Sequence, residues 1–197
     1  MNPLIRAFVA IDPGGEVRRA VGELQQDLRG AGVHATWVAP EACHLTLRFL
    51  GDVAPDLVAP IAKACREAAS GLRVFDLQFM GAGAFPNLRR PRVLWLGVGG
   101  GSAALMDLHK AIEGALDATG FTPDRTFSPH LTIGRLKRLP GPEVLRTLSA
   151  RLDALRARHF GRAHVSHALL LRSELLPSGP RYTALSEFPL GSRHQAD

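Results

Sequence analysis

Cysteine is scarce in this chain of 197 residues, which contains only Cys43 and Cys65. Two cysteines cannot form the disulfide framework of a small secreted domain, and their separation does not match the paired spacing of a zinc site. We therefore expect both side chains to be buried as small apolar groups rather than to act as reactive thiols.

Long apolar runs are also missing. No stretch approaches the roughly 20 apolar residues that a membrane-spanning helix needs. The segment from Met1 to Arg6 lacks the charged region followed by an apolar region that is typical of a secretory signal. We expect a cytoplasmic protein that does not associate with membranes.

Lysine is rare, because only Lys63, Lys110 and Lys137 contribute to the 24 basic residues and all the others are arginine. The formal net charge is +6. A codon bias explains this preference, since glycine and proline are abundant too. A surface that attracts phosphate explains it equally well, because the arginine guanidinium binds phosphate in a bidentate geometry.

The composition is that of a folded protein, with 46% hydrophobic and 21% charged residues. Apolar residues recur at helical spacing in four segments, and short apolar or alternating runs bounded by glycine and proline predict strands between them. The predicted helices span about 17–28, 57–68, 102–119 and 142–155. The predicted strands span about 4–11, 36–38, 43–50, 74–80, 93–98, 127–136, 165–175 and 182–188.

A short polar motif occurs twice, as His44-Leu45-Thr46-Leu47 and as His130-Leu131-Thr132-Ile133. Around each copy the predicted elements follow the order strand, helix, motif strand, helix, strand, which indicates an internal duplication. We expect a single bilobal domain over 1–197, with approximate halves 1–90 and 91–190 and a flexible tail at 191–197.

This repeat predicts an α+β fold with two lobes related by a pseudo-twofold axis. Each lobe would be a largely antiparallel sheet with helices on its outer face, so that the motif strands face a central cleft. Side chains alternate faces along a strand, and each copy therefore turns its histidine and threonine toward the cleft and its two apolar residues toward the core.

Two imidazoles on opposite sides of a reacting centre suit displacement at phosphorus. One takes a proton from the incoming water or hydroxyl while the other protonates the leaving oxygen. The hydroxyls of Thr46 and Thr132 can donate hydrogen bonds to the other phosphate oxygens. This division of work needs no metal and no cofactor.

Two other chemistries fit the sequence less well. A metal site is not indicated, because neither motif has His-x-x-x-His spacing and no acidic residue lies within three positions of His130. Serine hydrolase chemistry is not indicated either, because Gly-x-Ser-x-Gly is missing from the sequence.

The first motif continues as Arg48-Phe49-Leu50-Gly51, and Arg135 follows the second. With these residues the chain resembles the 2H phosphoesterase superfamily. Within it the chain is most similar to the RNA 2′,3′-cyclic phosphodiesterases, first described as 2′-5′ RNA ligases. The resemblance extends over nearly the whole chain and includes the runs from Arg6 to Ala10 and from Pro91 to Leu96.

The resemblance implies hydrolysis of the 2′,3′-cyclic phosphate at an RNA 3′ end to a 2′-phosphomonoester without a metal. It implies that His44 is the proton donor to the leaving 3′ oxygen, that His130 is the proton acceptor that activates water, and that Thr46 and Thr132 hold the phosphate. The reverse reaction would join RNA ends through a 2′-5′ linkage. We expect a monomer that needs no protein partner.

Phe49 and Arg135 each lie five residues after a motif histidine. The resemblance implies that they sandwich the terminal base, since an aromatic ring and a guanidinium both stack on bases. Strict alternation, however, turns both away from the histidines. A bulge at Gly134 would bring Arg135 back to the cleft. No glycine precedes Phe49, so a place in the core stays open for this side chain. Arg48 belongs either in the cleft or in an ion pair at the rim of the cleft.

The remaining histidines are expected to lie in loops, on helices or in the tail, exposed to solvent. These are His34, His109, His159 and His194. His164 and His167 begin a late strand with different parity, which argues against a shared metal site but leaves open a place in the cleft for one of them. The arginines of the loop before the strand at 93–98 form either a phosphate-binding patch or an ordinary solvated loop. They are Arg89, Arg90 and Arg92.

Two further functions remain open. The chain could be a phosphodiesterase for another cyclic substrate, such as ADP-ribose 1″,2″-cyclic phosphate, or for a 2′-5′ oligonucleotide. It could also be a non-catalytic module that binds RNA ends, although binding alone would not require both motif histidines.

Overall fold

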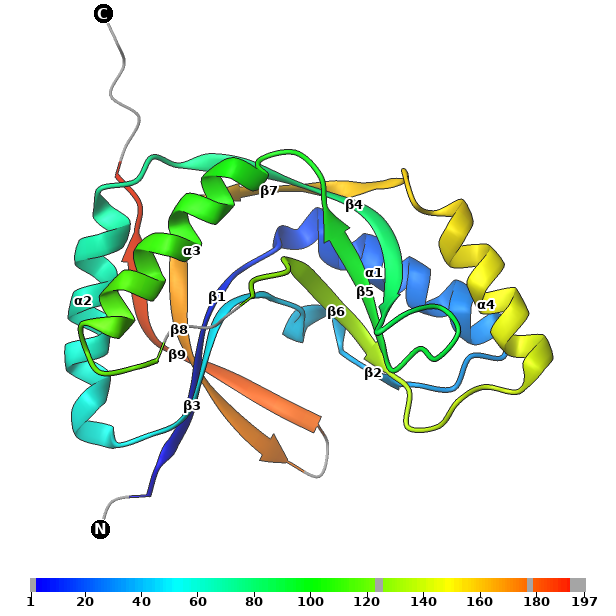
Figure 1. The fold of residues 1–197 in the computed structure, drawn as a ribbon, viewed down its shortest axis with the longest axis horizontal. Helices are drawn as coiled ribbons and strands as arrows, with labels where there is room; N and C mark the ends of the chain where they lie inside the picture. The colour runs from blue at the N-terminus through cyan, green and yellow to red at the C-terminus, as the bar shows by residue number, and fades with distance from the viewer. Residues whose placement is uncertain (1–2, 123–125, 177–178, 192–197) are drawn as a thin grey trace, which may run out of the picture.

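Strands and helices alternate along most of the chain in a computed structural model that describes residues 3–122, 126–176 and 179–191 (Figure 1). The helices are α1 (Gly14–Gly30), α2 (Val58–Ser70), α3 (Ser102–Asp117) and α4 (Pro142–Ala154). The strands are β1 (Ile5–Ile11), β2 (Thr36–Trp37), β3 (Leu45–Val53), β4 (Phe75–Phe85), β5 (Val93–Val98), β6 (His130–Arg135), β7 (His159–Val165), β8 (His167–Leu176) and β9 (Gly179–Pro189).

The strands form one antiparallel sheet in the order β7-β4-β5-β6-β3-β1-β8-β9. The short strand β2 is outside this order and pairs with the end of β6, at Gly134 and Arg135. The two motif strands, β3 and β6, meet at the centre, where Leu45 pairs with Leu131. This short junction divides the sheet into two half-sheets. The order is symmetric about the junction, since β6, β5, β4 and β7 on one side correspond to β3, β1, β8 and β9 on the other.

The helices cover the two half-sheets in pairs (Figure 1). α2 and α3 pack together against β9 and β3, whereas α1 packs on β7 and α4 on β4. The helix that follows β1 therefore crosses to the half-sheet of β6, and the helix that follows β5 crosses to the half-sheet of β3. The predicted α+β fold with two pseudo-twofold lobes is confirmed.

The core is formed by the apolar faces that the helical spacing predicts. In α1 these are Val17, Val21, Leu24 and Leu28, and all four are buried. Full burial of each such side chain contributes about 1.5–3 kcal/mol. Cys43 and Cys65 are buried as well, and burial raises the pKa of both thiols to about 12, which keeps them protonated and unreactive.

Three segments differ from the prediction. β7 was not predicted, because Gly161, Arg162 and His164 interrupt its buried residues. β4 continues to Phe85 where a loop was expected, since Gly83 lets the ring of Trp95 lie directly on the strand. The first motif strand also runs on to Val53, although Gly51 was expected to end it.

Residues 192–197 of the predicted tail lie outside the described residues, whereas the amide of Gly191 donates to the carbonyl of Leu72 at 2.7 Å. No helix within the described ranges is long and apolar enough to cross a membrane.

One glycine just before α3 and one within it provide a test of this packing. Gly101 precedes the helix with φ +81°, and a Cβ there would collide with the carbonyl oxygen of Asp76. Gly114 lies within the helix, where a Cβ would meet nothing within 4 Å. Gly101→Ala should destabilise the protein by at least about 1–2 kcal/mol. Gly114→Ala should stabilise it by about 0.5–1 kcal/mol. Urea unfolding measures both, and equal effects would contradict this placement of α3.

Candidate functional site

A cleft of about 570 Å³ lies where the two motif strands meet. His44 lines it from the position just before β3 and Thr46 from β3 itself, and His130 and Thr132 line it from β6. The structure therefore brings both predicted pairs into one cavity. The charged residues among its described lining are Arg6 and Arg135, and no carboxylate is among them. The cleft favours an anion.

The two histidines are oriented in the same way. Nδ1 of His44 lies 2.9 Å from the carbonyl oxygen of Ala42, and Nδ1 of His130 lies 2.8 Å from that of Ser128. A carbonyl only accepts hydrogen bonds, so each Nδ1 carries a proton and donates it to the residue two positions earlier. Nε2 of each ring is thus left to exchange protons with a bound molecule.

The surroundings of the two rings differ. The ring of His44 lies 4.6 Å from that of Phe8 and 4.9 Å from that of Tyr182. Burial lowers the pKa of His44, the charge of Arg135 adds to this effect, and the hydrogen bond to Ala42 opposes it. The ring of His130 makes an edge contact with Phe85 at 5.0 Å. Without a ligand, therefore, the neutral form of His44 is favoured.

Each motif strand contains a β-bulge directly after its threonine. On β3, Thr46 pairs with Ala10 and Arg48 with Val9, which leaves Leu47 as the extra residue. On β6, Thr132 pairs with Trp95 and Gly134 with Leu94, which leaves Ile133 as the extra residue. A bulge resets the alternation of side chains. Each side chain beyond the bulge therefore lies on the face opposite to the one that regular alternation would give it.

The bulges decide where Phe49 and Arg135 lie. Both line the cleft, and Phe49 is 44% exposed with its ring 4.7 Å from the guanidinium carbon of Arg6. The bulge predicted beside Gly134 is therefore confirmed. The alternative that Phe49 belongs to the core is wrong, because a bulge forms at Leu47 although β3 has no glycine there.

Arg48 does not enter the cleft. Past the bulge it is 8% exposed, and its Nε lies 3.4 Å from Oε1 of Glu113 on α3. It also donates to the carbonyl of Thr122. The cleft position considered for Arg48 is wrong, and its ion pair is buried beneath α3 rather than exposed at a rim.

A buried polar side chain holds the carbonyl of each bulge. His109 of α3 is 7% exposed, and its Nδ1 lies 3.2 Å from the carbonyl oxygen of Leu47. Gln25 of α1 is 2% exposed, and its Nε2 donates to the carbonyl of Ile133 at 2.9 Å and to that of Val38 at 2.7 Å. The expected exposure of His109 is wrong, because α3 packs over β3.

Sequence reasoning missed the cleft residues that lie outside the motif strands. Among them are Arg6, Phe8, Trp37 and Tyr182. Arg6 and Phe8 alternate along β1, a signal that the apolar run around them obscured. Tyr182, the only tyrosine of the chain, packs edge-on against Phe8 at 5.2 Å. The rings of Phe8 and Tyr182 together form the wall behind His44.

The other histidines lie away from the cleft. Nδ1 of His164 on β7 lies 2.8 Å from Oδ1 of Asp76 on β4 in an exposed hydrogen bond, and Nδ1 of His167 lies 3.1 Å from the hydroxyl of Ser166. His34 and His159 are exposed, and His194 lies outside the described residues. In the described part of the chain no group of three or more His, Cys, Asp or Glu side chains could hold a metal ion.

The role of Gln25 can be tested by a substitution that keeps its size. Gln25→Leu removes a side-chain donor from the carbonyl of Val38 and leaves that of Ile133 with the amide of Val38 alone. It should lower the free energy of unfolding by about 1–3 kcal/mol in urea. Gln26→Leu is the control, because Gln26 is exposed on the same helix, and it should change stability by less than about 0.5 kcal/mol. Equal effects of the two substitutions would contradict the support of the bulge by Gln25.

Comparison with protein families identifies one model, described as LigT like phosphoesterase, that matches residues 11–95 and again residues 97–182. A curated relative from Methanothermobacter thermautotrophicus is 37% identical, over 94% of this chain and 99% of its own. One from Aquifex aeolicus is 32% identical, over 95% of this chain and 98% of its own. Both are named RNA 2′,3′-cyclic phosphodiesterase.

Solved structures have the same fold. A crystal structure of a Thermus thermophilus protein aligns with a TM-score of 0.78 and 28% identity, over 96% of this chain and 100% of that one. Escherichia coli LigT in complex with 3′-AMP aligns with a TM-score of 0.74 and 24% identity, over 95% of this chain and 98% of that one.

Proposed function

Because the chain belongs to the LigT-like phosphoesterases of the 2H superfamily, we propose that it hydrolyses the terminal 2′,3′-cyclic phosphate of RNA to a 2′-phosphomonoester. The observation that carries this proposal is the pair of motif histidines in one cationic cleft, each with Nδ1 bound to its own backbone and Nε2 available. The curated relatives bear the name of this activity.

In the proposed reaction the oxygen of a water molecule attacks phosphorus while the bond from phosphorus to the 3′ oxygen breaks. Nε2 of His130 takes a proton from the water, and Nε2 of His44 gives a proton to the leaving 3′ oxygen. Thr46 and Thr132 donate hydrogen bonds to the non-bridging oxygens, and the charges of Arg6 and Arg135 offset the negative charge that develops there.

The terminal base is proposed to stack between Phe49 and Arg135. Both side chains line the cleft beyond the bulges, and an exposed aromatic ring is otherwise costly in water. The same chemistry run in reverse, with an RNA 5′-hydroxyl in place of water, would form a 2′-5′ linkage. We assign this activity to a cytoplasmic monomer that requires no metal, cofactor or protein partner.

We also propose that the halves 1–90 and 91–190 arose by duplication. The symmetric strand order and the matching bulges after Thr46 and Thr132 support this origin.

Loss of either histidine should abolish most turnover. His44→Ala and His130→Ala should each lower kcat on a nucleoside 2′,3′-cyclic phosphate by about 10²–10⁴-fold, the usual contribution of a general acid or base. His159→Ala is the matched control, because His159 is exposed on β7, and it should retain wild-type rates. Near-normal activity of either motif variant would overturn the proposed function.

The pH dependence should separate the free and the bound states of His44. As the acid, His44 must be protonated, so its titration sets the basic limb of the profile. Burial lowers its pKa in the free protein, and kcat/KM should therefore fall as pH rises through a value below the ordinary 6.5 or so. A bound phosphate anion favours the imidazolium, and the basic limb of kcat should lie at higher pH.

Steady-state rates measured from pH 4 to 9 would test this order. If the basic limb of kcat lay at the same pH as the basic limb of kcat/KM, or at a lower pH, the assignment of His44 as the proton donor would be contradicted.

A further inference from the structure

Two hollows extend the cleft along the edge formed by β2 and the end of β6. The first, of about 650 Å³, is lined by Thr36 of β2, by the loop from Lys137 to Gly141 and by Val144 of α4. Thr36 also lines the catalytic cleft, so these two spaces adjoin. The second hollow, of about 340 Å³, shares the lining residues Lys137, Arg138 and Leu139 with the first. We call the two hollows together the basic groove.

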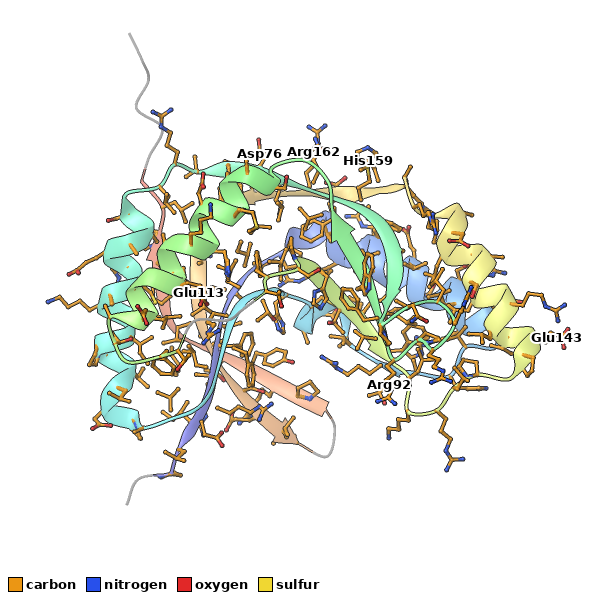
Figure 2. All side chains as sticks on the ribbon, viewed as in Figure 1. Asp76, Arg92, Glu113, Glu143, His159 and Arg162 are labelled. Carbon is orange, nitrogen blue, oxygen red and sulfur yellow. The ribbon has the colours of Figure 1, made fainter. Side chains whose placement is uncertain are left out.

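The groove is lined by cations. Arg90, Arg92, Lys137 and Arg138 are all exposed there, and the first hollow adds the exposed His34. No Asp or Glu belongs to the described lining of either hollow. Glu143 lies at the outer end of α4, whereas Arg92 lies beside the β2 edge (Figure 2). Among the described residues of its wall, the positive charge of the groove therefore has no acidic partner.

The backbone holds these cations in place. The amide of Leu136 donates to the carbonyl of Arg92 at 2.8 Å, which ties the segment after β6 to the segment before β5. Oδ1 of Asn87 accepts from the amides of Arg89 and Arg90, both at 3.0 Å. The arginine loop is thus ordered against the groove.

The opposite wall of the cleft differs in charge. There the described lining from the β8–β9 hairpin is uncharged and consists of Ser173, Leu175, Pro180 and Tyr182. Arg172 and Arg181 of the same hairpin are outside that lining and both bind the carboxylate of Glu174, at 3.1 Å and 3.0 Å. Because the described hairpin wall offers no cation to the cleft, a polyanion leaving the cleft is attracted to the groove side.

We propose that the basic groove binds the sugar-phosphate backbone of the RNA that precedes the terminal nucleotide. The inference rests on the proposed function, because it takes the RNA 3′ end to lie in the cleft. Arg135 contacts the last nucleotide, and the chain then runs over Thr36, which pairs with Arg135 across β2 and β6. Lys137, Arg138 and Arg92 bind the phosphates upstream.

The chemistry of the groove determines what it recognises. Contacts from lysine and arginine to phosphate carry no base sequence, so the groove increases affinity for any RNA end. Leu139, which is 57% exposed between the two hollows, offers an apolar contact for a ribose or a base. Affinity gained in this way falls with salt, by a slope of about 0.7 per phosphate contact on a single strand.

The test compares two substrates in each of two double variants. The substrates are a nucleoside 2′,3′-cyclic phosphate and a ten-nucleotide RNA that ends in the same cyclic phosphate. The groove variant is Lys137→Ala/Arg138→Ala. The control is Arg158→Ala/Arg162→Ala, which removes the same charge from exposed positions next to and on β7. Figure 2 shows Arg162 on this strand.

The groove variant should lower kcat/KM for the RNA at least tenfold relative to kcat/KM for the mononucleotide, and the salt slope for the RNA should fall by about 1.4, the value for two lost contacts. The control should leave this ratio unchanged. The proposed role of the groove would be overturned if the ratio of kcat/KM for the RNA to kcat/KM for the mononucleotide were equal in the groove variant and the wild type. It would also be overturned if this ratio fell equally in the control. Failure of the wild type to hydrolyse the mononucleotide would instead overturn the proposed function.

Discussion

A hydrogen bond from a covering helix to the carbonyl of a bulged residue supports each motif strand, and the cleft depends on this pair of contacts. A bulge interrupts the ladder of the sheet, and a carbonyl that lacks hydrogen bonds in a dry core is costly. His109 lies against the carbonyl of Leu47. Gln25 adds a second donor to the carbonyl of Ile133, which also accepts from the amide of Val38. With the bulges in place, a single strand can point its histidine and threonine into the cleft and still return a third side chain, Phe49 or Arg135, to the same face.

The two supports come from the opposite halves of the chain. α1 follows β1 but donates from Gln25 to β6, and α3 follows β5 but contacts β3 through His109. Neither half therefore completes its own motif strand. This exchange couples the position of each motif strand to the packing of a helix from the other half of the chain.

Local features of this fold could be predicted from the sequence, whereas features set by distant contacts could not. The helical faces follow from a period of 3.6 residues, and the motif pairs follow from alternation along a strand. The bulge at Leu47 could not be predicted, because its partner His109 is 62 residues away. Gly134 marked the second bulge, but the hydrogen bond to it from Gln25, 108 residues from Ile133, could not be predicted. The placement of Arg48 beneath α3 follows from the bulge at Leu47. A polar residue beside the apolar face of a helix, as at Gln25, is the one local sign of such a contact.

The two histidines share one local geometry but lie in different surroundings, and the proposed roles follow the family resemblance. The most direct test is to incubate the protein with an RNA that ends in a 2′,3′-cyclic phosphate and to locate the phosphate in the product. With His44 protonating the 3′ oxygen, the product should be a 2′-phosphomonoester. A 3′-phosphate, which requires the 2′ oxygen to leave, would contradict the account.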